Sequence, residues 1–115
     1  AICNAITSLT HVPILGKVAI DLCHKEGITD SRVYLDKALE TLGSQKIEHV
    51  ALTIEGKRPK FQKRADEIRQ SVATALNLNL DQVGMTFTSG DGLTAFGKGE
   101  GLMCYCILTT VELSD

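Results

Sequence analysis

The stretch from residue 47 to residue 88 constrains the fold of this 115-residue chain more than any other part. Its centre carries apolar side chains at helical spacing, with polar residues between them: Phe61, Ala65, Ile68, Val72 and Leu76. On either side, over 47–55 and 83–88, apolar residues alternate with small or polar ones, which is typical of strands. A strand, a helix and a strand of this length form one crossover unit, so we expect the two strands to pair in parallel.

Shorter signals place the other elements. Residues 1–11 have helical character, and residues 12–28 indicate a loop with some helix. Residues 29–31 (Thr-Asp-Ser) can cap a helix that Gly43 ends, because short side-chain oxygens accept the unpaired N–H groups of a first turn. The last strand, 102–113, has apolar or small residues on both faces. We therefore expect both faces to be covered, by helices on one side and with a second subunit as the candidate for the other.

The composition excludes two classes of partner. The chain has 12 Lys and Arg against 14 Asp and Glu, a net charge of −2, so it lacks the broad basic surface that nucleic acid requires. No apolar run reaches the ~20 residues that a membrane-spanning helix needs. The length fits a single domain over residues 1–115. The chain opens inside a helical pattern, without Met and without a secretory signal, and we interpret it as the C-terminal part of something longer.

The four cysteines do not follow a metal-binding pattern. There is no Cys-x-x-Cys, and without a secretory signal a reducing compartment is favoured over a disulfide framework. Cys104 and Cys106 are expected on the same face of a strand, in an apolar sheet interior. A metal site built on Cys23 and His24 is the weaker alternative, because adjacent residues rarely converge on one ion.

Three segments hold groups that can bind a ligand. Residues 56–61 (Gly-Lys-Arg-Pro-Lys-Phe) lie between a strand end and a helix start, which favours an anion or nucleotide pocket, with a solvated basic turn as the alternative. Residues 86–91 (Thr-Phe-Thr-Ser-Gly-Asp) bring hydroxyls and a carboxylate to a turn, groups that suit phosphate and Mg²⁺, with a plain hairpin turn as the alternative. Residues 97–101 (Gly-Lys-Gly-Glu-Gly) precede a strand, so a connecting turn is favoured over a phosphate loop.

The usual catalytic groups form no constellation. The three histidines are interpreted as surface or packing residues: His11, His24 and His49. No Ser lies in a Gly-x-Ser-x-Gly elbow, so acyl transfer by a serine nucleophile has no support. The candidate chemistry is therefore confined to the segments between elements.

Five sequence blocks occur in a specific order: residues 1–5, 29–32, 53–60, 88–94 and 97–101. The most specific parts are the Pro-Lys turn at 59–60 and the Gly-basic-Gly-Glu-Gly run. Together these blocks resemble the 2-C-methyl-D-erythritol 2,4-cyclodiphosphate synthase family of the non-mevalonate isoprenoid pathway. The resemblance runs over nearly the whole chain, as a divergent branch of the family.

The resemblance implies an α+β fold, with a single-layer mixed β-sheet and helices packed on one face. It implies a homotrimer around a central sheet-lined core, with active sites between subunits. The implied reaction converts 4-diphosphocytidyl-2-C-methyl-D-erythritol 2-phosphate to 2-C-methyl-D-erythritol 2,4-cyclodiphosphate and CMP, by attack of the 2-phosphate on the β-phosphorus. Such a lyase needs positioning and charge neutralisation, because the attacking phosphate is already anionic. The implied location is a bacterial cytoplasm or a plastid-type stroma.

The resemblance also implies substrate-binding residues. The segment that would enclose the cytosine, largely through backbone groups, comprises Gly56, Lys57, Arg58, Pro59, Lys60, Phe61 and Gln62. Thr88 and Ser89 match the positions at the phosphates, with Ser89 as the catalytic donor to the reacting diphosphate and Gly90 beside it. Lys98 and Glu100 match positions near the trimer axis, where some members hold an isoprenoid diphosphate in a central cavity.

The implied cofactors are Zn²⁺ and Mg²⁺. Asp91 matches a Mg²⁺-binding glutamate and is one methylene shorter, so coordination through water is expected. The family's zinc ligands are an Asp-x-His and a His directly before the position of Ala1, and none of them lies in this sequence. We therefore expect the zinc ligands upstream of Ala1.

Several positions depart from the family pattern. Ile14 stands where the family usually has an aspartate that binds the methylerythritol hydroxyls, although Gly16 remains as a substrate-binding position. Asn4 replaces an aspartate, and Ala95, in the substrate-binding segment, replaces a phenylalanine. These departures support a second hypothesis, a trimeric cytidine-nucleotide-binding or scaffold protein without turnover.

Overall fold

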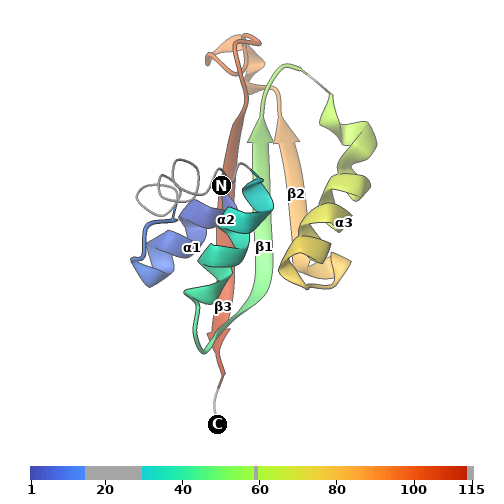
Figure 1. Cartoon of the computed structure of the whole chain (residues 1–115). Coiled ribbons are helices and arrows are strands. Elements are labelled where there is room, and N and C mark those ends of the chain that lie inside the picture. Colours follow the sequence, from blue (N-terminus) through green and yellow to red (C-terminus); the bar gives the residue numbers. More distant parts are fainter. Residues whose placement is uncertain (15–29, 59, 114–115) are drawn as a thin grey trace. The chain divides into compact units, whose positions relative to one another are not determined.

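The computed structural model describes residues 1–14, 30–58 and 60–113 (Figure 1). The chain divides into two compact units. The first comprises Ala1–Glu48 with Leu108–Asp115, and the second comprises His49–Ile107. The candidate site lies wholly in the second unit, so that unit is described more fully.

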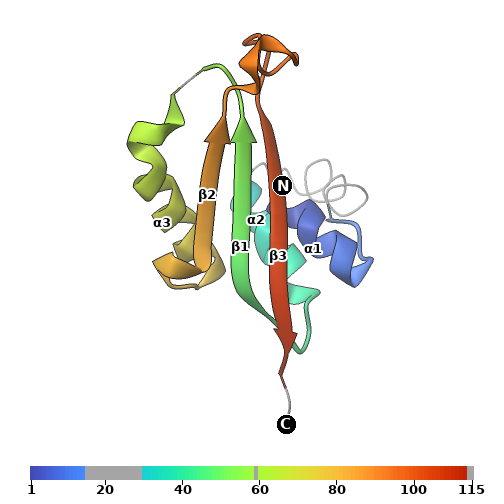
Figure 2. The ribbon, with the colours of Figure 1, turned by 180° about the vertical axis from the view of Figure 1, so that it is seen from behind.

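The described residues form a mixed three-stranded sheet, in the order β2-β1-β3. Its strands are β1 (Gln45–Glu55), β2 (Val83–Thr88) and β3 (Met103–Glu112). β1 and β2 pair in parallel, from Val50 opposite Val83 to Glu55 opposite Thr88, which confirms the predicted crossover unit. β3 runs in the opposite direction on the other side of β1 (Figure 2).

The crossover segment between β1 and β2 contains α3 (Ala65–Leu76), which contacts β2. The predicted helix begins one turn earlier, but Phe61–Arg64 form a 3₁₀ turn. No side chain caps that turn at Lys60, and a tight 3₁₀ turn is a common way to start a helix without a cap. The core of this unit includes five buried apolar side chains: Val50, Leu52, Ala73, Leu76 and Val83.

The first unit holds two helices that contact each other, α1 (Ile2–Thr10) and α2 (Ser31–Glu40). Both were predicted, and the predicted cap is confirmed, because Asp30 Oδ1 accepts a hydrogen bond from the Arg32 amide at 2.9 Å. Most of the loop predicted over 12–28 lies outside the described residues. None of the helices in the described part of the chain is long and apolar enough for a membrane crossing.

The side chains along β3 differ in exposure. Tyr105 is 60% exposed and Ile107 is 70% exposed, so within this chain one face of the strand is not covered. Cys106 is half-buried but Cys104 is exposed, and the prediction of a sheet interior is therefore wrong for Cys104. The physical reason is that Cys104 is the second residue of β3, next to the exposed residues 101 and 102, whereas Cys106 lies one pleat repeat further into the strand.

Candidate functional site

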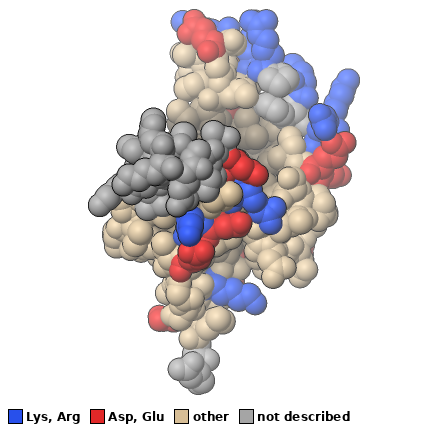
Figure 3. Space-filling model, viewed as in Figure 1, with Lys and Arg blue, Asp and Glu red and all other residues tan. Residues whose placement is uncertain are grey.

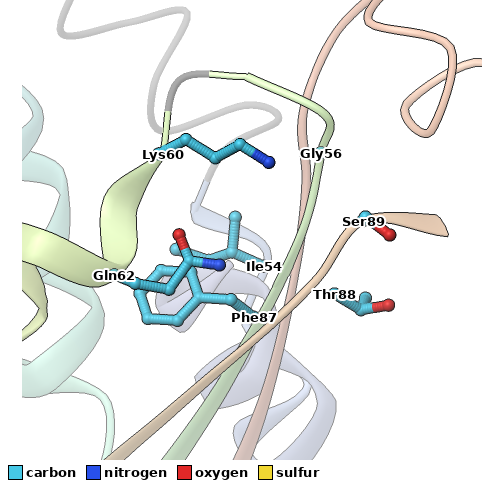
Figure 4. Close-up of a pocket in the computed structure, with 7 residues that line it drawn as sticks. All are labelled: Ile54, Gly56, Lys60, Gln62, Phe87, Thr88 and Ser89. Atoms are coloured by element: carbon cyan, nitrogen blue, oxygen red, sulfur yellow. The ribbon is translucent and has the colours of Figure 1, made fainter. Parts of the chain in front are cut away.

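A pocket lies where β1 and β2 end, beside the start of the crossover segment (Figure 4). It is lined by Ile54, Gly56, Lys60, Gln62, Phe87, Thr88 and Ser89. The carboxyl ends of parallel strands are where open α/β sheets bind ligands. Two of the three segments predicted to hold ligand-binding groups, 56–61 and 86–91, therefore meet at one pocket.

The side chains around the pocket form two groups. Figure 4 shows Ile54, Gln62 and Phe87 gathered together, with the Lys60 ammonium above them. The Thr88 and Ser89 hydroxyls point away from this group, to the other side of the strand end. An apolar surface with one amide and one cation suits a flat polar ring that is attached to an anionic group.

The residues that follow β1 are fixed by their backbone. The Gly56 amide donates to the Thr88 carbonyl oxygen at 3.0 Å, and the Lys57 amide donates to the Phe96 carbonyl oxygen at 3.0 Å. The Arg58 guanidinium lies against Gly99, where an added Cβ would come within 2.8 Å of Nη2. The connection after β1 is thus fastened both to the end of β2 and to the Gly-rich turn before β3.

Basic side chains surround this connection. Lys57, Arg58, Lys60, Lys63 and Arg64 occur within eight positions, and all five are exposed. Figure 3 shows Lys and Arg side chains gathered over the segment between β1 and α3. Arg64 is engaged by Glu67, with Nη2 and Oε2 2.8 Å apart. The local excess of positive charge favours an anionic ligand.

The turn after β2 is closed by its own polar groups. The Asp91 amide donates to Ser89 Oγ at 3.3 Å, and Ser89 Oγ donates to Asp91 Oδ1 at 3.2 Å. The Gly90 amide donates to Thr88 Oγ1 at 3.4 Å. Asp91 has a φ of 51°, between Gly90 at 70° and Gly92 at 73°. Glycine at both flanking positions lowers the free-energy cost of three consecutive residues with left-handed backbone conformation.

The other predicted site residues lie off the pocket or outside the description. Asp91, Ala95 and Lys98 are exposed in the connection between β2 and β3 and do not line the pocket. Ile14 belongs to the first unit and is only 2% exposed. Pro59 and Gly16 lie outside the described residues, and the side chain of Phe61 is likewise not described.

Sequence reasoning did not single out Glu55 or Thr94. Thr94 Oγ1 donates to Glu55 Oε2 at 2.8 Å and accepts a hydrogen bond from the Gly97 amide at 2.9 Å. The available signal was an acidic residue directly after the apolar and hydroxyl run of residues 50–54, at the last position of β1. Its partner lies 39 residues further on, so no local pattern connects the two.

The metal-binding potential of the site rests on one carboxylate. No group of three or more His, Cys, Asp and Glu that could hold a metal ion is present among residues 1–14, 30–58 and 60–113. Mg²⁺ is commonly held by one or two carboxylates together with substrate phosphates and water, which Asp91 fits. Catalytic Zn²⁺ takes about three protein ligands, and the described residues do not supply such a set.

Known proteins similar to this chain were found at the levels of sequence and structure. Residues 1–111 match the sequence pattern of the YgbB family. The 2-C-methyl-D-erythritol 2,4-cyclodiphosphate synthase of Chlamydia caviae is 58% identical over 113 residues, which are 97% of this chain and 64% of that protein. The synthase of Chlamydia trachomatis serovar D is 49% identical over the same share of both chains. The chain thus spans less than two thirds of the length of these relatives.

Solved structures show the same fold. A Plasmodium falciparum IspF in complex with CDP aligns with a TM-score of 0.76 at 17% identity, over 99% of this chain and 69% of that one. The bifunctional IspDF from Campylobacter jejuni aligns with a TM-score of 0.84 at 16% identity, over 96% of this chain and 31% of that one. The resemblance drawn from the five sequence blocks is confirmed: the chain belongs to the YgbB family, together with the chlamydial 2-C-methyl-D-erythritol 2,4-cyclodiphosphate synthases.

Proposed function

We propose that this chain provides the cytidine-nucleotide site of a cyclodiphosphate synthase. The substrate is 4-diphosphocytidyl-2-C-methyl-D-erythritol 2-phosphate, and the products are the 2,4-cyclodiphosphate and CMP. The observation that carries the proposal is the single pocket wall that joins Gly56, Lys60 and Gln62 to Thr88 and Ser89. Two segments that the family resemblance connects with the cytosine and with the phosphates meet there.

The roles follow from the two groups of side chains. The pyrimidine ring packs against Ile54 and Phe87, and the Gln62 amide and the backbone near Gly56 satisfy its polar edge. Lys60 supplies positive charge toward the phosphates. Ser89 donates a hydrogen bond to the diphosphate, where negative charge builds up during the reaction.

The chemical step needs no protein nucleophile. An oxygen of the 2-phosphate forms a bond to the β-phosphorus, and the bond from the β-phosphorus to the bridging oxygen breaks. CMP leaves with that oxygen and its electron pair. The residues of this chain hold the two phosphates in line and offset their charge, which is the main task in phosphoryl transfer.

The Ser89 hydroxyl must exchange its acceptor for this role, within a turn whose backbone stays as it is. Ser89 Oγ donates to Asp91 Oδ1 in the structure, so a phosphate oxygen has to replace that carboxylate oxygen as the acceptor. The same change frees Asp91 to hold Mg²⁺, which when bound neutralises the charge of adjacent phosphates. The described residues do not fit the zinc ion that the family resemblance implies, and no step here depends on it.

We also propose that the protein acts as a homotrimer. The uncovered apolar face of β3, with Tyr105 and Ile107 exposed, supports contact with further copies. The family resemblance implies sites between subunits, and a central cavity near Lys98 and Glu100 that would accept an isoprenoid diphosphate. Analytical ultracentrifugation tests the assembly, and a monomer at all concentrations would remove the intersubunit site.

The decisive experiment for the activity is CMP release. We expect the complete natural polypeptide that carries this sequence to convert the substrate to CMP and the cyclic diphosphate when Mg²⁺ and Zn²⁺ are supplied. Phosphorus NMR measures the two products. Metal-loaded protein that releases no CMP contradicts the proposal.

A binding protein without turnover is the second candidate. Ile14 favours it, because this buried apolar side chain stands where the family resemblance expects an aspartate for the methylerythritol hydroxyls. Calorimetry separates the two candidates: CDP binding without CMP release supports the binding protein.

A further inference from the structure

Glu55, the last residue of β1, carries a carboxylate that contacts the connection between β2 and β3. Glu55 lies opposite Thr88 in the parallel register. Its Oε2 accepts the hydrogen bond from Thr94 Oγ1 at 2.8 Å. An ionised carboxylate only accepts hydrogen bonds, so the threonine hydroxyl must be the donor. The lone pairs of the Thr94 hydroxyl oxygen are then available to accept from the Gly97 amide, 2.9 Å away. The two hydrogen bonds therefore run in one direction, from Gly97 to Thr94 and from Thr94 to Glu55.

Glu55 does not face the pocket. Ile54, its neighbour in β1, lines the pocket. Successive side chains of a strand point to opposite faces, so the Glu55 carboxylate lies on the face of the sheet opposite Ile54. Glu55 therefore does not contact a ring held against Ile54 and Phe87, and its effect on a phosphate at Ser89 passes through the turn that carries Ser89.

The residue through which it acts is Gly90. A Cβ added to Gly90 would lie 3.0 Å from Thr94 Oγ1, 3.1 Å from Gly97 Cα and 3.3 Å from the carboxyl carbon of Glu55. The hydrogen-bonded pair thus packs closely against Gly90, which connects Ser89 to Asp91. Gly90 has a φ of 70°, a conformation that its neighbours must maintain because glycine itself does not prefer it.

We propose that Glu55 and Thr94 are positioning residues that hold the Ser89–Asp91 turn in the conformation needed for transfer at the diphosphate. This inference rests on the proposed function of Ser89. The pair lies on the face opposite Ile54 and Phe87, so it sets the geometry at the phosphates and leaves the grip on the pyrimidine unchanged. A carboxylate suits this task because a hydrogen bond to an ionised acceptor is shorter and stronger than one between neutral groups.

Variants of Thr94 give the sharpest test. Thr94→Val keeps the shape of the side chain but removes both hydrogen bonds, whereas Thr94→Ser keeps the hydroxyl. In the complete natural polypeptide, Thr94→Val is expected to lower kcat roughly 10- to 100-fold, the range for a small misplacement of reacting groups. KM and the Kd for CMP should stay within about twofold. Thr94→Ser should keep most of the wild-type kcat.

Glu55→Gln tests the charge on the acceptor. The amide oxygen still accepts from Thr94, so kcat should fall by less than in Thr94→Val. Thr74→Val is the matched control, because it removes a threonine hydroxyl whose hydrogen bond to Gln70 lies on the exposed side of α3. That control should leave kcat unchanged. A parallel fall of kcat and CMP affinity in Thr94→Val, or an unchanged kcat, would overturn the proposal.

Amide hydrogen exchange separates this proposal from the proposed function. Exchange at the Gly97 and Asp91 amides should speed up in Thr94→Val but not in Thr94→Ser, while amides in the middle of β2 should not change. Absence of CMP release by the wild-type protein refutes the synthase function and leaves this exchange pattern as expected. Unchanged exchange at Asp91 in Thr94→Val refutes the positioning role, whatever the wild-type activity.

Discussion

Arg69 Nε donates to the carbonyl oxygen of Val83 at 2.8 Å, which joins α3 to the first residue of β2. The same guanidinium donates from Nη2 to the Leu80 carbonyl oxygen at 3.0 Å. Val83 is only 1% exposed, so water has little access to this residue, whereas Leu80 is exposed. One side chain therefore fixes the register between the crossover helix and the strand that delivers Thr88 and Ser89 to the pocket.

We predict that Arg69→Met lowers the free energy of unfolding by about 2 kcal/mol. It removes the hydrogen bonds to Val83 and Leu80 and the exposed one to Asp66, and it leaves the part-buried Val83 carbonyl oxygen without its side-chain donor. Thermal or urea unfolding measures the effect. The control is Arg64→Met, which removes an exposed pair with Glu67 and should cost less than about 1 kcal/mol. An equal decrease in the free energy of unfolding in the two variants would show that the contact with Val83 contributes no more than an exposed ion pair.

Gly99→Ala tests the contact between the Gly-rich turn and Arg58. Gly99 has a φ of 85°, and an added Cβ would lie 2.8 Å from Arg58 Nη2. We expect a loss of stability of about 1 to 2 kcal/mol for the left-handed backbone, plus a contribution from the displaced guanidinium. Gly92→Ala is the control for the backbone alone, because φ there is 73° and its Cβ would meet open space.

The contribution of the guanidinium can be isolated by adding Arg58→Ala to each glycine variant. This change should recover part of the loss in Gly99→Ala and none of it in Gly92→Ala. Recovery of the same size in both backgrounds would indicate that the Arg58 contact is not the cause.

Ser89→Ala should lower kcat of the complete natural polypeptide roughly 100-fold, the usual effect of losing one preorganised donor to developing charge. The Kd for CMP should change little, because the hydroxyl points away from the group formed by Ile54, Gln62 and Phe87. Ser71→Ala, at an exposed position of α3, serves as the control. An unchanged kcat would exclude Ser89 from the mechanism.

Burial raises the pKa of the Cys106 thiol to about 11, with a smaller upward contribution from Cys104. The neutral thiol is therefore the dominant form at neutral pH, and the reactive thiolate forms only as the pH approaches 11. We predict that alkylation of Cys106 by iodoacetamide rises about tenfold per pH unit between pH 7 and pH 9. Peptide mass spectrometry follows the site, with Cys106→Ser as the control. A plateau near pH 8 would contradict the raised pKa.

Periodicity made the crossover unit predictable. The apolar stripe of α3 and the alternation in β1 and β2 are local signals, and the parallel direction of the pair follows from the length of the connection. The positions of Gly56 and Ser89 at one pocket follow in turn, because parallel strands end at the same edge.

Other features depend on contacts that a local pattern does not contain. The exposure of Cys104 follows from its place at the start of β3, beside a connection that leaves it uncovered, which the alternation of residues along the strand does not reveal. The link between Glu55 and Thr94 spans 39 positions and depends on how two connections fold above the sheet. The internal bond between Ser89 and Asp91 also could not be predicted, because the same residues suit an open phosphate-binding turn equally well.

That internal bond makes the turn after β2 selective in a way that its composition alone would not suggest. A ligand must outcompete a carboxylate that is already bound to the hydroxyl, which only a strongly anionic group does well. A neutral nucleoside would pack against Ile54 and Phe87 and leave the hydrogen bond between Ser89 and Asp91 intact. The negative charge of the ligand therefore determines whether it binds the Ser89 hydroxyl. Uncharged analogues would bind in the pocket without a hydrogen bond to that hydroxyl.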